Sequence, residues 1–420
     1  MSGVDFQAGE FWRVVVETVA WLVAGAWCWR TSDAVRFLPG VTDLSTLDWD
    51  RGPVEQRTLT VVVPAKDEGD NLAATLDALL MADYAALRIL VVDDRSTDAT
   101  GKIVDGYVVE EQGKQGRQGE QGTAKARPVL EAIHVTELPL GWLGKTHAME
   151  VATRHSDSEY LLFTDADVLF SPSVLRRAMA YAEASEADHL VLLPTMQVKT
   201  RGEGVVLGFF QILGMWYSRL WRVDDAESQR DYAGVGAFNM VRREALEKIG
   251  GWAPQRMVVL EDITLGRRMK SAGMRQRIAF APGLVLVHWA VGARGLVRTM
   301  TKNLFSAVNF RPLLLLGACA WITLFCLAPL AGFFWYTTLV PSLLVLMCVG
   351  ASYRLLGDVS QIDARYGWLY PLGAAAFVWA MLRSMVTVLA RRGVVWRGTF
   401  YPLRELRRHN NLRQWRKRTG

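Results

Sequence analysis

The chain contains few cysteines, and their positions argue against a disulfide framework. Only four occur among 420 residues, and each lies in an apolar stretch without the spacing of a metal site. They are Cys28, Cys319, Cys326 and Cys348. We therefore interpret them as packing residues, because a free cysteine in apolar surroundings behaves as a small hydrophobic side chain.

Charge is also sparse, and it is unevenly distributed. Charged residues make up 21% of the chain, hydrophobic residues make up 51%, and the net charge is only +6. From Arg391 to Gly420, however, ten Lys or Arg accompany a single acid, Glu405. This segment (391–420) directly follows an apolar stretch, which favours a basic cytoplasmic tail next to a membrane over a nucleic-acid-binding arm.

Long apolar runs occur near both ends of the chain. Residues 14–29 are somewhat short for a full span, and their tryptophans and the acidic residues before them favour a retained anchor (1–30) over a cleaved signal peptide. A C-terminal transmembrane region is predicted over 312–390, from the stretches Leu313–Ala331, Phe333–Ala351 and Trp368–Ala390. If the middle of the chain and the tail are both cytoplasmic, one of these three stretches must be re-entrant or interfacial.

Between the apolar regions, residues 57–290 predict an α/β domain. The β-branched runs "LTVVVPA" (59–65) and "LRILVVDD" (87–94) are separated by a helical pattern with Leu72, Leu76 and Leu79 on one face. This alternation is typical of a βαβ unit in a parallel sheet. The Gly/Gln-rich segment 110–122 interrupts the pattern, and we expect it to be a solvated loop insertion.

Acidic side chains follow the predicted strands. In "YLLFTDADVLF" (160–170), Asp165 and Asp167 are two residues apart, so both project to one face of an extended chain. Two like charges this close favour a cation between them, or else a strand end that lies in water. Asp93 and Asp94 end another strand, and ligands of open α/β sheets bind at this edge.

Two local sequence patterns could be mistaken for functional motifs. "GWLGKT" (141–146) is similar to a phosphate-binding P-loop, but the first glycine of that motif is replaced by Pro139, which excludes a nucleoside triphosphatase of this kind. Ser96, Thr97 and Asp98 are typical of the start of a helix, and we expect them only to cap it.

Six segments give the chain a resemblance to a known family. They are "VVVPAKDEGDNL", "VVDDRSTDAT", "LGKTHAMEVA", "FTDADVLF", "GVGAFNMVRREALEKIGGW" and "LEDITLGRRMKSAG". In this order they resemble family 2 glycosyltransferases with the GT-A fold, over most of residues 59–290. The flanking apolar segments and "WRGTFY" (396–401) are similar to the membrane-bound members that glycosylate lipids, such as the ceramide, carotenoid and hopanoid-associated glycosyltransferases. The resemblance implies a Rossmann-like, mostly parallel α/β catalytic domain with N-terminal and C-terminal transmembrane helices.

The resemblance also implies a donor site and a metal. Asp167 would coordinate Mg²⁺ or Mn²⁺, and Asp165 would lie near the metal or the ribose, since hard cations prefer oxygen ligands. Asp94 would accept a hydrogen bond from uracil. Lys145 would neutralise the donor phosphates. Asp67 or Glu68, after Pro64, would border the base.

A catalytic base follows from the same resemblance. The family's base matches Asp262, with Glu261 as second choice, because an inverting transfer needs a carboxylate to take the acceptor's proton. Without the resemblance, two acids at the start of the helical stripe Leu265, Met269 and Ala272 would be interpreted as complementing the helix dipole.

One family motif is missing. Many relatives carry Q-x-x-R-W or R-x-x-R-W after the base, and "HWAVGARGLVRTMTKNLF" (288–305) has no match. Arg294 and Arg298 share a helix face and could replace its charge, with Arg298 at the donor. The alternative is an interfacial amphipathic segment (291–311) whose Leu296, Met300 and Leu304 face lipid. With residues 205–221, this segment would form an apolar rim through which a lipid acceptor enters.

The leading hypothesis is an inverting hexosyltransferase that moves sugar from a nucleotide sugar, with UDP as the expected nucleotide, to a hydroxyl of a membrane lipid. We expect an integral protein of the plasma (inner) membrane with a cytoplasmic catalytic domain and no nucleic-acid partner. The alternatives are a polysaccharide synthase, a polyprenyl-phosphate sugar transferase, and a non-catalytic scaffold on a transferase fold. Intact Asp94, Asp165, Asp167 and Asp262 argue against the scaffold. The sequence leaves the sugar, the acceptor and the oligomeric state open.

Overall fold

The structure is a computed structural model that describes residues 2–119 and 128–409. Its chain divides into two compact units, which we name by their composition. The helical unit comprises residues 1–40, 198–221 and 290–387, and the α/β unit comprises residues 41–197, 222–289 and 388–420. The α/β unit therefore includes the end of the chain as well as its middle.

A seven-stranded sheet forms the centre of the α/β unit, in the order β3-β2-β1-β4-β8-β6-β9. The strands are β1 (Leu59–Ala65), β2 (Leu87–Asp94), β3 (Val129–Val135), β4 (Tyr160–Phe163), β6 (His189–Leu193), β8 (Asn239–Arg242) and β9 (Gln276–Phe280). All neighbouring strands are parallel except β8, which runs antiparallel to β4 and β6. The predicted mostly parallel α/β fold is confirmed, and β1 and β2 have the predicted bounds.

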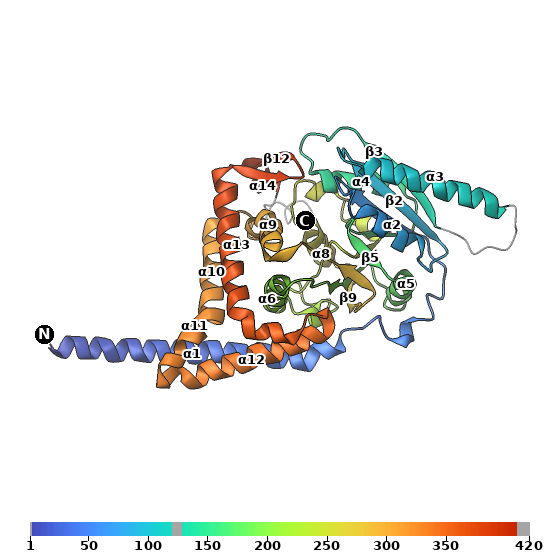
Figure 1. The fold of residues 1–420 in the computed structure, drawn as a ribbon. Coiled ribbons are helices and arrows are strands. Elements are labelled where there is room, and N and C mark those ends of the chain that lie inside the picture. The colour runs from blue at the N-terminus through green and yellow to red at the C-terminus, as the bar shows by residue number, and fades with distance from the viewer. Residues whose placement is uncertain (1, 120–127, 410–420) are drawn as a thin grey trace. The chain divides into compact units, whose positions relative to one another are not determined.

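Helices cover both faces of this sheet (Figure 1). One face of β1 and β2 packs against α2 (Leu72–Leu80), α3 (Thr100–Gly119) and α5 (Val174–Ala184). The other face packs against α4 (Gly144–His155), α7 (Arg243–Lys248) and α8 (Glu261–Ser271). Leu72, Leu76 and Leu79 are fully buried, as their helical spacing predicts.

Two smaller sheets complete the α/β unit. One contains β5 (Val168–Phe170), β10 (Val285–Val287) and β7 (Thr195–Met196), in that order. The other is a hairpin of β11 (Gly393–Trp396) and β12 (Thr399–Pro402), followed by α14 (Leu403–His409). Residues 393–409 of the predicted basic tail are therefore folded into the α/β unit, while residues 410–420 lie outside the described residues.

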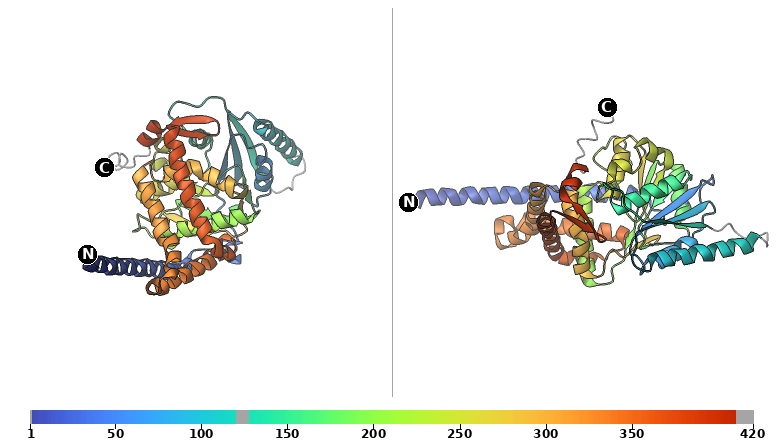
Figure 2. Two further views of the ribbon diagram at one scale, coloured as in Figure 1. Left: turned by 60° about the vertical axis from the view of Figure 1, so that its left-hand side comes forward. Right: turned by 90° about the horizontal axis from the view of Figure 1, so that it is seen from above.

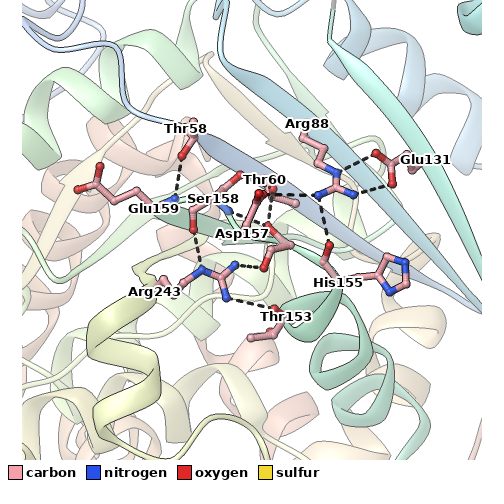
Figure 3. A network of polar contacts seen from close by, with 11 residues as sticks. Thr58, Thr60, Arg88, Glu131, Thr153, His155, Asp157, Ser158, Glu159 and Arg243 are labelled. Carbon is pink, nitrogen blue, oxygen red and sulfur yellow. Dashed lines mark hydrogen bonds and ion pairs between the residues drawn. The ribbon is translucent and has the colours of Figure 1, made fainter.

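A polar network fixes the amino-terminal ends of the central strands (Figure 3). The guanidinium of Arg243 donates to the carbonyl oxygens of Ser158 at 2.8 Å and Thr153 at 3.2 Å. Nearby, Arg88 forms a two-bond pair with Glu131, at 2.6 and 2.9 Å. These polar groups are hydrogen-bonded to one another, and they lie at the sheet edge opposite the carboxyl ends of the strands. We therefore infer that the network stabilises the fold.

The helical unit contains α1 (Ser2–Phe37), α6 (Arg201–Tyr217), α9 (Gly292–Ala307), α10 (Pro312–Ile322), α11 (Ala328–Ala331), α12 (Tyr336–Ser360) and α13 (Tyr370–Ala390). Among the residues that the structure describes, four helical stretches are long and apolar enough to cross a membrane: Glu10–Gly40, Pro312–Phe334, Tyr336–Ser360 and Ala364–Ala390. In Figures 1 and 2, α1 lies alongside α12, and the sulfur atoms of Cys28 and Cys348 are 3.7 Å apart there.

The structure corrects three sequence predictions. The expected loop over 110–122 is wrong for residues 110–119, which continue α3, and residues 120–122 lie outside the described residues. The N-terminal helix extends beyond the predicted anchor (1–30) to Phe37, which removes the doubt about its length. Leu296 and Met300, predicted to face lipid, are buried, although α9 keeps Arg294 and Arg298 exposed.

Candidate active site

A pocket lies at the carboxyl ends of β1 and β2. Residues from five parts of the α/β unit line it: Pro64, Ala65, Lys66, Asp94, Arg95, Gly144, Lys145, Asp165, Trp396, Arg397, Thr399 and Tyr401. Its basic side chains are Lys66, Arg95, Lys145 and Arg397, and its acidic side chains are Asp94 and Asp165. Such a mixture suits a ligand that carries phosphate as well as neutral polar groups.

Asp165 and Asp167 occupy the connection between β4 and β5. Ala166 between them is buried and both acids are partly exposed, but they lie in a turn after β4 ends at Phe163 and not in the extended chain that the sequence predicts. The two carboxylates are nevertheless close enough for the charge of Asp165 to raise the pKa of Asp167. The connection is held by the Asp165 N–H, which donates to the carbonyl of Gly236 at 3.1 Å. A side chain at Gly236 would collide with the Asp165 carboxylate, because its Cβ would lie 2.6 Å from Oδ2.

Lys145 is the positive centre of this acidic cluster. Its ammonium nitrogen lies 2.5 Å from Asp165 Oδ1 and 2.6 Å from Glu261 Oε1. Burial alone would lower the pKa of Lys145, but the charges of Asp165 and Glu261 outweigh it and raise that pKa. The ammonium is therefore charged, and it joins the β4 connection to the start of α8.

Glu261 and Asp262 form the first turn of α8, as the sequence predicts. Burial and the neighbouring charge of Glu261 raise the pKa of Asp262 to about 7. The backbone here packs tightly: a Cβ at Gly234 would lie 2.0 Å from the Asp262 carbonyl oxygen, and one at Gly266 would lie 1.7 Å from the carbonyl of Ala233. These two glycines allow the loop before β8 to lie directly against α8.

The acidic cluster offers two carboxylates, Asp165 and Asp167, to a divalent cation. Burial, together with the charges of Asp165 and Glu68, raises the pKa of Asp167 to about 6, so a cation would stabilise the ionised form. Within residues 2–119 and 128–409, no group of three or more His, Cys, Asp or Glu is arranged to hold a metal. An ion here would take one or two carboxylates from the protein and its other ligands from phosphate and water, as Mg²⁺ commonly does.

Asp94 has a partner that sequence reasoning missed. Both of its carboxylate oxygens accept from the guanidinium of Arg95, at 2.7 and 2.9 Å. The pair is packed against the start of α4, where a Cβ at Gly144 would lie 2.1 Å from Asp94 Oδ2. The positive φ of Arg95, 58°, turns its side chain back toward Asp94, and no pattern in the sequence signals this conformation.

Pro64 and the two acids after it, Asp67 and Glu68, differ in whether they line the pocket. Pro64 lines the pocket, but the carboxylate of Asp67 accepts from the N–H of Thr97 at 2.7 Å, and neither Asp67 nor Glu68 lines the pocket. Glu68 instead pairs with Arg397. Asp98 accepts from the N–H of Thr100 at the start of α3, in line with the predicted cap. The expectation that these residues only cap the helix is wrong, because Asp98 also accepts the N–H of Gly69 and the Ser96 hydroxyl accepts the N–H of Asp67.

Arg298 and the segment "WRGTFY" (396–401) were both singled out in the sequence, and only the segment lines the pocket. Arg298 lies in α9 of the helical unit, and its role at the donor stays a prediction. The "WRGTFY" segment, by contrast, supplies Trp396, Arg397, Thr399 and Tyr401 to the pocket. The sequence offered only a resemblance for this segment and no residue roles.

Comparisons with known proteins find similarity to glycosyltransferases. The model of the family "Glycosyl transferase family 2" matches residues 60–250. A 4,4'-diaponeurosporenoate glycosyltransferase from Staphylococcus aureus is 21% identical over 272 residues. That match covers 63% of this chain and 66% of the relative, so the chain spans just under two thirds of the relative's length.

A solved structure also shares the fold. The mannosyltransferase PcManGT from Pyrobaculum calidifontis, in complex with GDP-Man and Mn²⁺, superposes with a TM-score of 0.50 at 20% sequence identity. The superposition covers 90% of this chain and 99% of that chain. At this identity the likeness supports the GT-A fold of the α/β unit and leaves the substrates open.

Proposed function

We propose, from the match of residues 60–250 to the model of glycosyl transferase family 2, that the protein transfers a sugar from a nucleotide sugar to a hydroxyl of a membrane lipid. The observation that carries the proposal is the cluster of Lys145, Asp165, Glu261 and Asp262 beside Asp167. It offers fixed charges of both signs and a carboxylate of raised pKa at one place, as a group transfer from a diphosphate requires.

The donor would bind with its diphosphate toward the basic residues. Lys145 would hold a phosphate oxygen as a point charge, and Asp165 would keep the ammonium oriented. Asp167, with Asp165, would hold Mg²⁺ or Mn²⁺, which neutralises the charge that develops on the leaving diphosphate. Asp94 would direct the base or ribose through its pair with Arg95. UDP is the nucleotide we expect, and GDP is the alternative to test, because PcManGT is in complex with GDP-Man.

Asp262 would be the catalytic base. In an inverting transfer it accepts the proton of the acceptor hydroxyl while that oxygen attacks the anomeric carbon from the face opposite the diphosphate. A raised pKa suits this role, since a base works best when its pKa is near the operating pH. Glu261 pairs with Lys145, which leaves it a positioning role.

A lipid acceptor is supported by composition and by one relative. Four stretches are long and apolar enough to cross a membrane, and the relative from Staphylococcus aureus is named for a carotenoid acid. We therefore propose an integral membrane enzyme, with the α/β unit on the cytoplasmic side of the plasma membrane. A polysaccharide synthase remains the second candidate, and soluble acceptors distinguish the two.

The test is transfer by the purified full-length protein in detergent micelles. We expect it to form a glycolipid from a total lipid extract with Mn²⁺ and either UDP-glucose or GDP-mannose, and to lose this activity in excess chelator. Asp262→Asn should reduce transfer at least about a hundredfold while nucleotide binding persists, because only the base is lost. Transfer to soluble oligosaccharides without any glycolipid would favour the polysaccharide synthase. Full turnover in chelator would contradict the metal assignment.

A further inference from the structure

The hairpin of β11 and β12, beyond the matched family segment, forms one wall of the pocket. It supplies four of the lining residues, Trp396, Arg397, Thr399 and Tyr401. The hydroxyl oxygen of Tyr401 accepts the N–H of Gly144 at 3.2 Å, and Tyr401 itself is buried. Because Lys145 follows Gly144 in the first turn of α4, this bond fixes the hairpin beside the proposed phosphate-binding lysine.

Arg397 stands at the tip of the hairpin in an unusual backbone conformation. Arg397 and Gly398 are the two residues between the paired positions Trp396 and Thr399, and their φ angles are 46° and 76°. Positive φ at both positions defines a tight turn that favours Asn, Asp or Gly at the first one. An arginine held there costs free energy, on the order of 1 kcal/mol, and such strain tends to occur where a ligand is bound.

The contacts of Arg397 leave it able to bind an anion. Its guanidinium donates to the carbonyl oxygen of Lys66 at 2.8 Å and pairs with Glu68, while the side chain is 38% exposed. A guanidinium has five N–H donors, so these two contacts leave others for a ligand. Lys66, Arg95 and Lys145 line the same pocket, which makes its charge favourable for a diphosphate.

We propose that Arg397 is a donor-binding residue whose guanidinium binds the diphosphate of the nucleotide sugar. The inference rests on the proposed function and extends it, because it assigns to a segment near the end of the chain a part of the donor site. Glu68 and the Lys66 carbonyl hold the guanidinium in place before the donor arrives. Arginine suits this task better than lysine because its planar fork matches two phosphate oxygens at once.

Nucleotide binding to the purified full-length protein tests this directly. Calorimetric titration with UDP, UMP, GDP and GMP in the presence of Mn²⁺ gives the preference for diphosphate over monophosphate. In Arg397→Gln we expect diphosphate affinity to fall about ten- to hundredfold, the worth of a charge-assisted hydrogen bond, while monophosphate affinity is unchanged. Arg397→Lys should recover part of the loss. Arg404→Gln is the matched control, since Arg404 is exposed on α14 and does not line the pocket.

The outcomes separate this inference from the proposed function. If Arg397→Gln weakens diphosphate and monophosphate equally, or neither, Arg397 only fastens the hairpin and the inference is wrong, while the proposed function stands. If the unmutated protein binds none of the four nucleotides, the proposed function fails and the inference fails with it. In transfer assays Arg397→Gln should raise the KM for the donor with little change in kcat, as expected when a binding contact is removed.

Discussion

Asp262 carries a carboxylate whose ionisation should control activity near neutral pH. Burial and the charge of Glu261 raise its pKa to about 7, and a general base must be ionised to accept a proton. Below about pH 7 we therefore expect kcat/KM to fall about tenfold for each pH unit, as Asp262 becomes protonated. Glu261→Gln removes the neighbouring negative charge, which should lower the pKa of Asp262 and move this limb of the profile to lower pH.

The pH profile of lipid glycosylation measures this shift. Glu227→Gln serves as the charge control, because Glu227 is exposed and does not contribute to the pKa shift of Asp262. An acidic limb that stays in place when Glu261 is changed would mean that another group titrates.

The positions of some site residues could be predicted from the sequence, and those of others could not. The closeness of Asp165 and Asp167 was predictable from their spacing of two residues, although they lie in the turn between β4 and β5 and not on an extended strand. Arg95 and Arg397 were not, because their positions depend on backbone turns with positive φ at non-glycine residues. For Arg397, the sequence also gave no sign that residues about 330 positions from Lys66 would return to the same pocket, where the two are hydrogen-bonded.

At the scale of elements, Glu203 joins the starts of two helices. Its carboxylate accepts the N–H groups of Lys199 at 2.7 Å, Thr200 at 3.2 Å and Gly292 at 2.6 Å, which links α6 to α9. Burial raises the pKa of Glu203, but these three bonds outweigh it and lower the pKa to about 2. Glu203→Gln should lower the free energy of unfolding by about 1–3 kcal/mol, because the Gln amide has one acceptor oxygen where the carboxylate has two, and its NH2 group would face a backbone N–H donor.

Thermal unfolding in detergent measures this loss against Glu244→Gln, an exposed glutamate in the first turn of α7. A carboxylate with a lowered pKa stabilises the fold fully above its unfolded value, near 4.5, and less as pH falls toward about 2. The difference between the unmutated protein and Glu203→Gln should therefore shrink in acid. Equal melting temperatures for the two glutamate variants at neutral pH would contradict the linking role.

Elements were predictable where local pattern and burial agree. β1 and β2 have the predicted bounds because β-branched residues are buried on both faces of a central strand. The continuation of α3 through the Gly/Gln-rich residues 110–119 was not predictable, since glycine disfavours a helix by about 1 kcal/mol and composition alone indicated a loop.

At the scale of the whole molecule, the α/β unit contains residues from both sides of the C-terminal apolar region. Residues 388–409 belong to the same compact unit as residues 41–197, and Tyr401 is bonded to Gly144 within it. The sequence could identify apolar stretches by length and hydropathy, but hydropathy does not reveal which soluble segments fold together. The sequence therefore predicted a basic cytoplasmic tail over 391–420 without indicating that residues 393–409 fold into the α/β unit.

This shared unit constrains the path of the chain through the bilayer. Residues on both sides of 290–387 lie in one folded unit and therefore on one side of a membrane, so the chain between them must cross an even number of times. Three stretches there are long and apolar enough to cross: Pro312–Phe334, Tyr336–Ser360 and Ala364–Ala390. We predict that at most two of them are complete spans, and that a remaining one lies within or along the interface.

Cysteine labelling tests the prediction in intact cells. On a background without the four native cysteines, Asp157→Cys and Arg404→Cys place single thiols at exposed positions, one in the middle of the chain and one after the last apolar stretch. Because the two positions share a side, we expect identical labelling by an impermeant maleimide. With a cytoplasmic α/β unit, both react only after lysis. If one thiol reacts in intact cells and the other does not, an odd number of these stretches crosses the membrane, and the hairpin cannot form a wall of the pocket.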